Sequence, residues 1–435
     1  MKSIRLSILL LGLLGLFFQP VQAQSETPLV VVMQADGDIM PAMETYIKRG
    51  LDSASQQAAS LVVLELNTPG GSIATMQDII TDIRSSAVPV VVYVSPRGAW
   101  AGSAGTLITL AGHAAAMAPE TVIGAASPVG SGGQELDPTL KAKQTEALTA
   151  TVRSLTERRG QKAMDLAQST ITDAKAVSAD EAYQAGLIDF IATDLNDLLT
   201  RLDGFTVQMN DGPRVLHTRN ARTEPLNMNL VEQAMLLIAD PNISFLLMAV
   251  GVLAILIEIS APGGWVAGFT GVVCLALGIY GAGSLPVNWF GMIFFLTAFV
   301  LFILDIKAPT HGALTAAGVG SFIAGALILF NSPGTPPTQQ VSIPLVILVG
   351  MLIGLMFAGV LYFALRAQRA PIHTGAETIV GQSGKAREWT DRSGQVQVES
   401  ELWSAEPAEG SETIRKGDNV EVVKVEGLRL IVKKK

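Results

Sequence analysis

Residues 98–106 read Gly-Ala-Trp-Ala-Gly-Ser-Ala-Gly-Thr, and residues 67–71 read Asn-Thr-Pro-Gly-Gly. Each of these glycine-rich segments follows an apolar run typical of a β-strand, at 61–66 and 88–94. Because the carboxyl ends of parallel strands meet at one edge of a sheet, we expect the two segments to lie together. One segment can then supply backbone N–H groups for an oxyanion, and the other can present Ser103 as a nucleophile.

The surrounding sequence predicts an α/β domain at 24–200, because short apolar runs alternate with stretches of helical periodicity. The expected strands are 29–34, 61–66, 90–94, 121–123 and 188–192, and the expected helices are 41–57, 73–86, 103–113, 138–159 and 178–185. Ser72 is placed to cap the second of these helices. Residues 201–240 are less periodic and are interpreted as a linker.

Residues 1–23 have the pattern of a secretory signal peptide. Lys2 and Arg5 provide the positive charge, residues 6–18 are apolar, and Val21-Gln22-Ala23 resembles a cleavage site. The alternative is an uncleaved anchor helix. In both cases we expect the α/β domain to be exported.

The region 241–366 is interpreted as a multi-pass membrane domain. It holds five apolar segments, at 243–259, 265–282, 288–306, 312–330 and 343–365. If the α/β domain lies outside, five spans put Lys307, Arg366 and Arg369 on the cytoplasmic side, as the distribution of basic residues favours. Four spans, or a re-entrant first pair, remain alternatives. Glu258 and Asp305 lie near segment ends and are interpreted as interfacial acids that reach water.

Residues 371–435 predict a small β-barrel of the OB type. The expected strands are 377–380, 384–389, 394–399, 419–425 and 428–433. This domain has a balanced charge and only two aromatic residues, Trp389 and Trp403, and the whole chain has a net charge of −8. Both properties argue against nucleic-acid binding and favour a protein-interaction role. Cys274 is the single cysteine, which excludes an intramolecular disulfide.

A serine nucleophile requires a base to accept its proton. His113 is ten residues after Ser103, which on a continuous helix would place it about 15 Å along the axis. The other three histidines lie in the predicted linker, in the membrane region or beyond it. A lysine with a lowered pKa can act instead. Lys141 and Lys143 both follow the helix start Asp137-Pro138, and their spacing does not choose between them.

The ordered set of motifs resembles the long-form NfeD family. The residues that carry this resemblance are Asn67-Thr68-Pro69-Gly70-Gly71, Gly102-Ser103-Ala104-Gly105-Thr106, Gly124-Ala125-Ala126-Ser127-Pro128-Val129, the lysine-bearing helix, Ala182-Tyr183-Gln184-Ala185-Gly186-Leu187-Ile188-Asp189, Pro262-Gly263-Gly264 and Gly427-Leu428-Arg429-Leu430-Ile431-Val432. The resemblance covers essentially the whole mature chain. It implies an α/β ClpP/crotonase-like protease domain with a Ser–Lys dyad, an all-α membrane domain of about five helices and a small OB-like β-barrel.

The resemblance also implies roles for individual residues. Ser103 matches the family's nucleophile and Lys143 its general base, while Gly71 and the N–H of Ala104 form the oxyanion hole, with Gly70 allowing close backbone approach. No cofactor or metal is implied. Glu146 stands where the family commonly has asparagine, and an acid there would raise the pKa of the lysine and weaken it as a base.

Partners and location follow from the same resemblance. We expect a stomatin- or flotillin-like membrane protein as partner, a peptide or protein substrate with an apolar segment, contact with membrane lipid and a homo-oligomer. The expected location is the cell inner membrane, with the protease domain periplasmic and the C-terminal domain cytoplasmic.

Three functions remain open at this stage. The first is an active serine endopeptidase, and the second is a catalytically weak scaffold that organises stomatin-like proteins. The third is a crotonase-like enzyme acting on acyl thioesters. The export signal disfavours the third, because acyl-CoA substrates are cytoplasmic.

Overall fold

The computed structural model describes residues 27–129, 137–261, 263–308, 310, 312–332, 335, 339–368 and 378–435. The predicted signal peptide at 1–23 lies outside the described residues. Internal contacts divide the chain into one unit up to Gly354 and a second unit from Leu355 onward. The fold class predicted from the sequence, an α/β domain followed by apolar helices and a small barrel, is confirmed.

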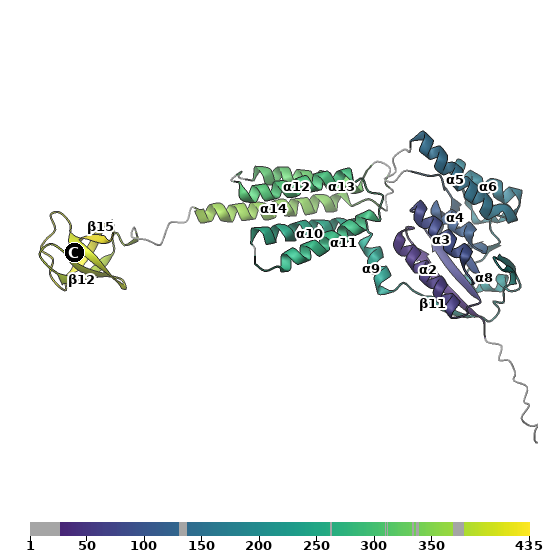
Figure 1. Cartoon of the computed structure of the whole chain (residues 1–435), viewed down its shortest axis with the longest axis horizontal. Coiled ribbons are helices and arrows are strands. Elements are labelled where there is room, and N and C mark those ends of the chain that lie inside the picture. Colours follow the sequence, from purple (N-terminus) through teal and green to yellow (C-terminus); the bar gives the residue numbers. More distant parts are fainter. Residues whose placement is uncertain are drawn as a thin grey trace, which may run out of the picture. The chain divides into compact units, whose positions relative to one another are not determined.

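A six-stranded parallel sheet forms the centre of the α/β domain (Figure 1). Its strands, in spatial order, are β11 (Arg222–Leu226), β1 (Leu29–Asp36), β2 (Leu61–Asn67), β3 (Val90–Val94), β5 (Ala114–Met117) and β8 (Phe190–Ile191). Alternate residues of β3 enter different cores: Val90, Val92 and Val94 on one face, Val91 and Tyr93 on the other. Burial on both faces explains why these strands are continuously apolar.

Helices cover both faces of this sheet. One face packs against α2 (Pro41–Gln56), α3 (Ile73–Ser85), α4 (Ala104–Ala111), α5 (Pro138–Thr156) and α6 (Gln161–Thr172). The other face packs against α8 (Leu195–Leu202) and the hairpin of β9 (Thr206–Met209) and β10 (Gly212–Val215). The 3₁₀ turn η1 (Glu157–Arg159) joins α5 to α6, and α7 (Ala179–Gln184) precedes β8. Ser72 caps α3 by accepting a hydrogen bond from Thr75 N, as predicted.

A second, three-stranded sheet lies beside the first. It consists of β4 (Trp100–Gly102), β6 (Val122–Gly124) and β7 (Ala176–Ser178). The sequence predicted β6 to within a residue but not β4 or β7. All three strands have only three residues, which is too short for a reliable periodicity.

The helix expected at 103–113 is confirmed as α4, which ends at Ala111. Residues 114–117, for which no element was predicted, form β5. The predicted linker 201–240 is largely structured. It contains β9, β10, β11 and α9 (Leu230–Ile238), and β11 pairs in parallel with β1 at the edge of the main sheet.

Helix α9 is fixed to the α/β domain by a salt bridge. Arg49 of α2 donates two hydrogen bonds to the buried carboxylate of Glu232, at 2.6 and 2.8 Å. Asn229 and Glu232 form a reciprocal capping box at the start of α9. The chain therefore reaches the first apolar helix from an ordered segment.

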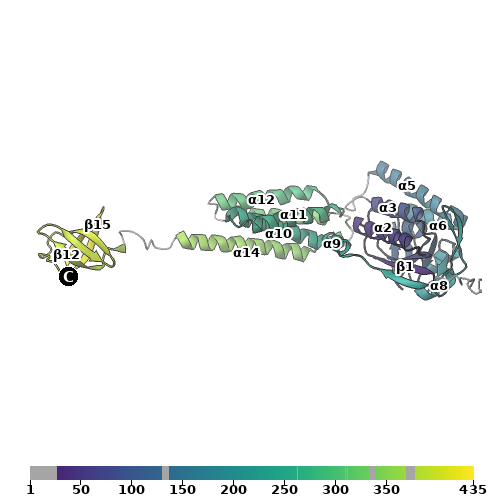
Figure 2. The same cartoon turned by 60° about the horizontal axis from the view of Figure 1, so that its bottom comes forward.

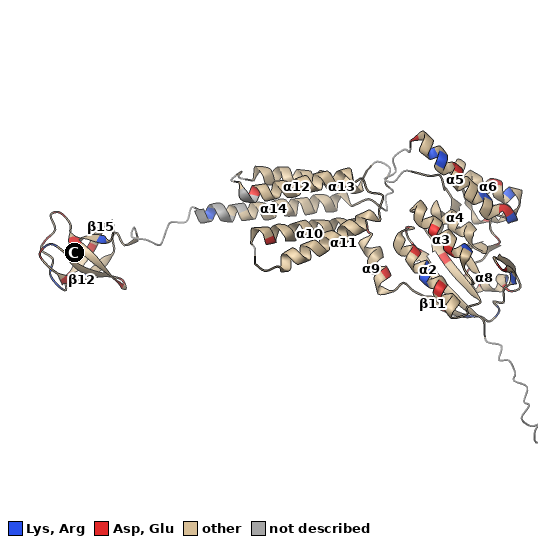
Figure 3. Cartoon of the chain, in the orientation of Figure 1, with Lys and Arg blue, Asp and Glu red and all other residues tan. Residues whose placement is uncertain are grey.

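The five predicted apolar segments are helices, nearly free of charged residues (Figure 3). They are α10 (Pro241–Ser260), α11 (Val266–Gly283), α12 (Phe290–Lys307), α13 (Ala313–Phe330) and α14 (Ile343–Gln368). Of the described residues, four of these helices are long and apolar enough to cross a membrane, and the apolar part of α12, 290–305, is shorter. Glu258 accepts hydrogen bonds from the backbone N–H groups of Gly263, Trp265 and Gly268, so it caps the turn between α10 and α11.

The C-terminal strands form a closed five-stranded barrel, seen from two directions in Figures 1 and 2. They are β12 (Ser383–Trp389), β13 (Gly394–Val398), β14 (Glu401–Pro407), β15 (Asn419–Glu426) and β16 (Arg429–Lys434). The strand expected at 377–380 is wrong for its described part, since residues 378–380 form a turn. Strand β14 was missed because only two of its seven residues, Leu402 and Trp403, are large and apolar.

Candidate active site

The two glycine-rich segments lie at the same edge of the main sheet, as predicted. Strands β2 and β3 are parallel, and each segment leaves the carboxyl end of one of them. The segments are joined directly: Thr68 N donates to Trp100 O at 2.7 Å, and Gly102 N donates to Thr68 O at 2.9 Å. The candidate nucleophile is therefore held against the candidate oxyanion loop by backbone hydrogen bonds.

Ser103 occupies the turn between β4 and α4. Its backbone has φ of 50° and ψ of −115°, a conformation uncommon for a residue with a side chain. Its N–H donates to Gly124 O at 2.9 Å, and α4 begins at the next residue. A strained turn of this kind at the start of a helix is typical of a presented nucleophile.

Gly70 is in contact with Ser103. Its φ is 124°, and a Cβ at this position would lie 2.6 Å from Ser103 Cβ and 3.1 Å from Ser103 Oγ. A side chain at position 70 would therefore displace the serine. The role of Gly70 in allowing close backbone approach remains a prediction from the family resemblance.

Two backbone N–H groups remain unpaired beside Ser103. Within the described residues, neither Gly71 N nor Ala104 N donates a hydrogen bond. Ala104 is the first residue of α4, where the N–H has no partner inside the helix and where the helix dipole favours negative charge. The arrangement can bind an oxyanion.

Two threonines support this loop, and the sequence analysis gave neither a role. Thr68 Oγ1 accepts a hydrogen bond from Gly70 N at 3.0 Å. Thr106 Oγ1 accepts from Gly124 N at 3.0 Å and contacts Ala101 O at 2.9 Å. Both side chains are fully buried. The signal that could have identified them is a hydroxyl residue inside an otherwise small and apolar segment.

A small cleft of about 50 Å³ opens beside Ser103. Its apolar walls come from α3, α4 and α5 and include Met76, Leu107 and Leu148. The loop 126–129 forms another wall. Such a lining accepts an apolar side chain next to the hydroxyl.

Among the described residues, no hydrogen bond joins Lys143 to Ser103. It lies near the start of α5, its side chain is exposed, and it makes no hydrogen bond or ion pair with any described residue. Lys141 is exposed as well, and neither lysine lines the cleft. Residues 130–136, which precede α5, lie outside the described part of the chain. Lys143 as the base therefore remains a prediction.

His113 lies at the opposite edge of the sheet. It directly precedes β5, and its Nδ1 accepts a hydrogen bond from Val90 N at the start of β3. Burial, together with the positive charges of Arg84 and Arg158, lowers its pKa to about 4. A neutral histidine at the amino ends of these strands is a structural residue.

Asp189 has a structural role at the end of its motif. Its carboxylate forms a bidentate pair with Arg159, both distances being 2.9 Å, and accepts a hydrogen bond from Ala115 N at 2.7 Å. It thereby ties the turn after α5 to strand β5. Among the described residues, no three His, Cys, Asp or Glu side chains gather in an arrangement suited to a metal ion.

Three family models match the chain. Residues 29–209 match a model described as NfeD1b, N-terminal domain, and residues 242–363 match the NfeD integral membrane domain. Residues 376–434 match the NfeD-like C-terminal, partner-binding domain. The matches follow the same order as the three regions of the fold.

The chain is also similar to two proteins over 99% of its length and to a solved structure over about half of it. It is 32% identical to the membrane-bound protease PH1510 of Pyrococcus horikoshii, covering 99% of this chain and 98% of that protein. It is 26% identical to the membrane protein NfeD1b of Bacillus subtilis, covering 99% of each. A solved structure, the 1510-N membrane protease specific for a stomatin homolog from Pyrococcus horikoshii, is 31% identical and covers 49% of this chain and 99% of that chain, with a TM-score of 0.43.

Proposed function

The chain belongs to the NfeD family, and from this premise we propose that it is a membrane-anchored serine endopeptidase with Ser103 as nucleophile. The observation that carries the proposal is the pair of unpaired N–H groups, of Gly71 and Ala104, on either side of a serine held in a strained turn. A buried structural serine needs neither feature. Together they suit a tetrahedral intermediate of acyl transfer.

In the proposed reaction, Ser103 Oγ attacks the carbonyl carbon of the peptide bond. The negative charge that develops on the carbonyl oxygen is stabilised by the N–H groups of Gly71 and Ala104. Lys143 accepts the proton of the hydroxyl and passes it to the leaving amine. Water, activated by the same lysine, then hydrolyses the acyl-enzyme and releases Ser103.

The assignment of Lys143 rests on the family resemblance. In this role it must be deprotonated when the serine attacks, which requires a less polar environment than that of an exposed side chain. We propose that substrate or a second copy of the chain covers Lys143. A homo-oligomer, expected from the family, would provide such a cover.

A catalytically weak scaffold is the second candidate function. The exposed and unpaired Lys143 favours it, because the described residues do not form a complete dyad. The match of residues 376–434 to a partner-binding domain fits either function. We propose a stomatin- or flotillin-like membrane protein as partner, by analogy with the stomatin homolog named for the 1510-N protease.

The proposed substrate is a protein segment with apolar side chains, in keeping with the lining of the cleft. We also propose an inner-membrane location in contact with lipid, with the α/β domain periplasmic and the barrel cytoplasmic. Basic residues at the ends of alternate apolar segments support this orientation.

The test is cleavage of an apolar peptide panel by the purified full chain in detergent. Ser103→Ala and Lys143→Ala should each reduce kcat/KM by at least about a hundredfold, because each removes a group that acts directly in the reaction. Lys141→Ala is the matched control, a lysine two residues away on the same helix, and should retain activity. A wild-type chain that is folded yet no more active than Ser103→Ala across the panel would favour the scaffold.

A further inference from the structure

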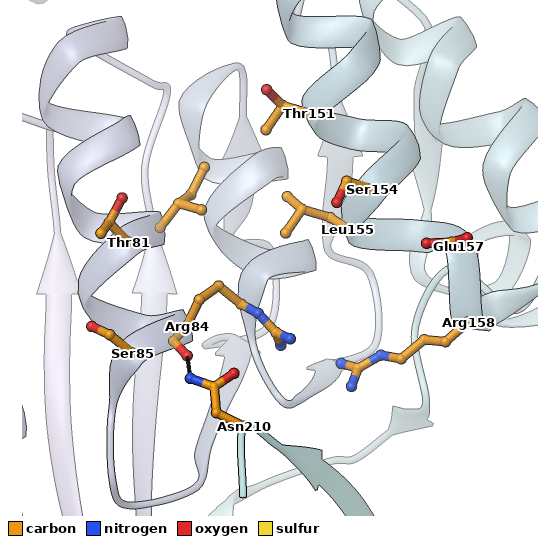
Figure 4. A pocket seen from close by; sticks show the side chains of 10 residues that line it. Thr81, Arg84, Ser85, Thr151, Ser154, Leu155, Glu157, Arg158 and Asn210 are labelled. Carbon is orange, nitrogen blue, oxygen red and sulfur yellow. Dashed lines mark hydrogen bonds between the residues drawn. The ribbon is translucent and has the colours of Figure 1, made fainter. Parts of the chain in front are cut away.

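A second and larger cavity lies away from the Ser103 cleft and shares no lining residue with it. It has a volume of about 830 Å³ and opens between the last turn of α3, the C-terminal half of α5 with η1, and the β9–β10 turn at Asn210 (Figure 4). None of the functions discussed above uses this cavity.

Two arginine side chains converge in this cavity. Arg84 comes from the last turn of α3 and Arg158 from η1, and their guanidinium groups point toward one another in Figure 4. Arg158 Nη2 donates to Gly112 O and His113 O, both at 3.1 Å, which fixes its position. The guanidinium of Arg84 makes no hydrogen bond or ion pair with any residue that the structure describes.

Among the described residues, no acid forms an ion pair with Arg84 or Arg158. Partial burial lowers the pKa of both arginines, and the charges of Arg159 and Arg84 lower that of Arg158 further. Asp189 is engaged by Arg159, and Asp211 by Arg214. Glu157 also lines the cavity, but it is exposed and forms no ion pair within the described residues.

Two guanidinium groups that face each other repel because both are positively charged. An anion bound between them attracts both groups and offsets this repulsion. A tetrahedral oxyanion has oxygens on more than one side, so it can accept hydrogen bonds from both guanidinium groups at once. The hydroxyl of Ser154, which also lines the cavity, adds a further donor. A carboxylate is planar and singly charged, and it suits one arginine better than two that face each other.

We propose that Arg84 and Arg158 form a binding site for a phosphate group, either as free phosphate or as the head group of a lipid. The site belongs to the α/β domain and is separate from the Ser103 cleft. Its occupant would join the end of α3 to the end of α5.

The test is a calorimetric titration of the full chain in detergent with inorganic phosphate, at constant ionic strength set with sodium chloride. Wild type should bind phosphate, and Arg84→Gln should bind it at least about tenfold more weakly, since one charge-assisted pair is lost. Because the guanidinium of Arg84 makes no hydrogen bond or ion pair with a described residue, this variant should retain the wild-type melting temperature. Arg153→Gln, an exposed arginine on α5 outside the cavity, should bind as wild type does.

A second titration, with dihexanoyl phosphatidic acid below its micellar concentration, distinguishes the two sources of the phosphate group. Tighter binding than that of inorganic phosphate, weakened in Arg84→Gln, assigns the site to a lipid head group, and equal or weaker binding assigns it to free phosphate. The proposal is overturned if wild type binds neither probe, or if Arg84→Gln binds both as tightly as wild type.

Discussion

The two residues of the proposed dyad differ sharply in their surroundings. Ser103 is held in a strained turn by hydrogen bonds of its own backbone and by contact with Gly70, whereas Lys143 stands exposed on α5 without a partner among the described residues. The proposed oxyanion donors are backbone N–H groups, and the proposed nucleophile is on a short side chain, so the local chain alone can fix their positions. The proposed base, Lys143, is on a long side chain, and the surroundings that would lower its pKa must come from other segments.

Helix α5 itself shows the same contrast between its two ends. Its first turns, which carry Lys141 and Lys143, are exposed, while Leu148, Val152 and Thr156 are buried against the domain. The C-terminal end is further anchored through η1 by the buried arginine of the Arg159–Asp189 pair. The lysines therefore lie on the less anchored part of the helix.

The largest effect is expected from Gly70→Ala, which places a methyl group against Ser103. We expect kcat/KM to fall by about a hundredfold to a thousandfold, the range seen when an oxyanion donor is lost. Gly98→Ala is the matched control, because Gly98 also has a positive φ, of 83°, but nothing lies near its missing Cβ. Peptide hydrolysis and thermal unfolding of both variants check this prediction. Equal activity of the two would show that the contact with Ser103 is unimportant.

A pH-dependent effect on stability is expected from His113, at the edge of the main sheet opposite Ser103. The pKa of His113 is lowered from 6.5 to about 4 by burial, so the unfolded chain binds a proton between these values that the folded chain does not. The stabilisation by neutral His113 is complete above about pH 6.5 and is lost as the pH falls toward 4, by roughly 3 kcal/mol in all. The measurement is hydrogen exchange in β3 and β5 at pH 7 and pH 5.

The variant His113→Asn isolates this contribution, because comparison at the same pH cancels the intrinsic exchange rates. Between pH 7 and pH 5, the free energy of opening measured by hydrogen exchange should fall in both proteins. The fall in wild type should exceed the fall in the variant by roughly 2 kcal/mol. His217→Asn removes an exposed histidine and should behave as wild type. Identical pH dependence in all three chains would assign the change to other groups.

An intermediate effect is expected from Arg159→Lys at the anchored end of α5. Lysine keeps the charge but cannot form the bidentate pair with Asp189, so we expect a loss of about 2 kcal/mol in stability. The comparison is Arg97→Lys, whose ion pair with Glu120 is 3.7 Å long and exposed on both sides, and which should have no measurable effect. Thermal unfolding of the two variants measures how much the Arg159–Asp189 pair contributes to stability, and equal melting temperatures would contradict the prediction.

The smallest effect is expected from Glu146→Gln, near the exposed lysine. Glu146 lies three residues after Lys143 on the same helix, and both side chains are exposed, so their interaction is weak. We expect kcat/KM to rise by about twofold at low salt and to be unchanged at 1 M salt, where surface charges are screened. A rise of tenfold or more would mean that Glu146, and not Lys143 alone, is covered during catalysis.

Much of the fold was predictable from the sequence because long buried strands and long apolar helices leave strong patterns. Strands β1, β2 and β3 and the five apolar helices were predicted to within a few residues. Strand β11 was not, because Arg222–Leu226 is a polar edge strand without alternating apolar residues. Strand β5 was missed because its alanine run, 114–116, has no periodicity that distinguishes it from the preceding helix.

The candidate site follows the same rule. The two segments that hold Gly70, Gly71, Ser103 and Ala104 were predictable as neighbours, since glycine-rich turns at the carboxyl ends of two parallel strands meet at one edge. The roles of Gly70, Gly71 and Ala104 came from the family resemblance and remain predictions. Thr68 and Thr106 were not singled out, because their function depends on hydrogen bonds between segments that are distant in sequence. Lys143 could be assigned only by resemblance, because helical spacing alone does not say which lysine faces a neighbour.

The position of β11 limits how far the α/β domain can move from the membrane. The main sheet extends to Leu226 and the first apolar helix begins at Pro241, so only residues 227–240 connect them. Even fully extended, this segment would span on the order of 50 Å, and the helical α9 makes it considerably shorter. The α/β domain is therefore held close to the membrane. If it is the protease proposed above, the peptide bonds that it can reach are those near the point where a substrate leaves the membrane.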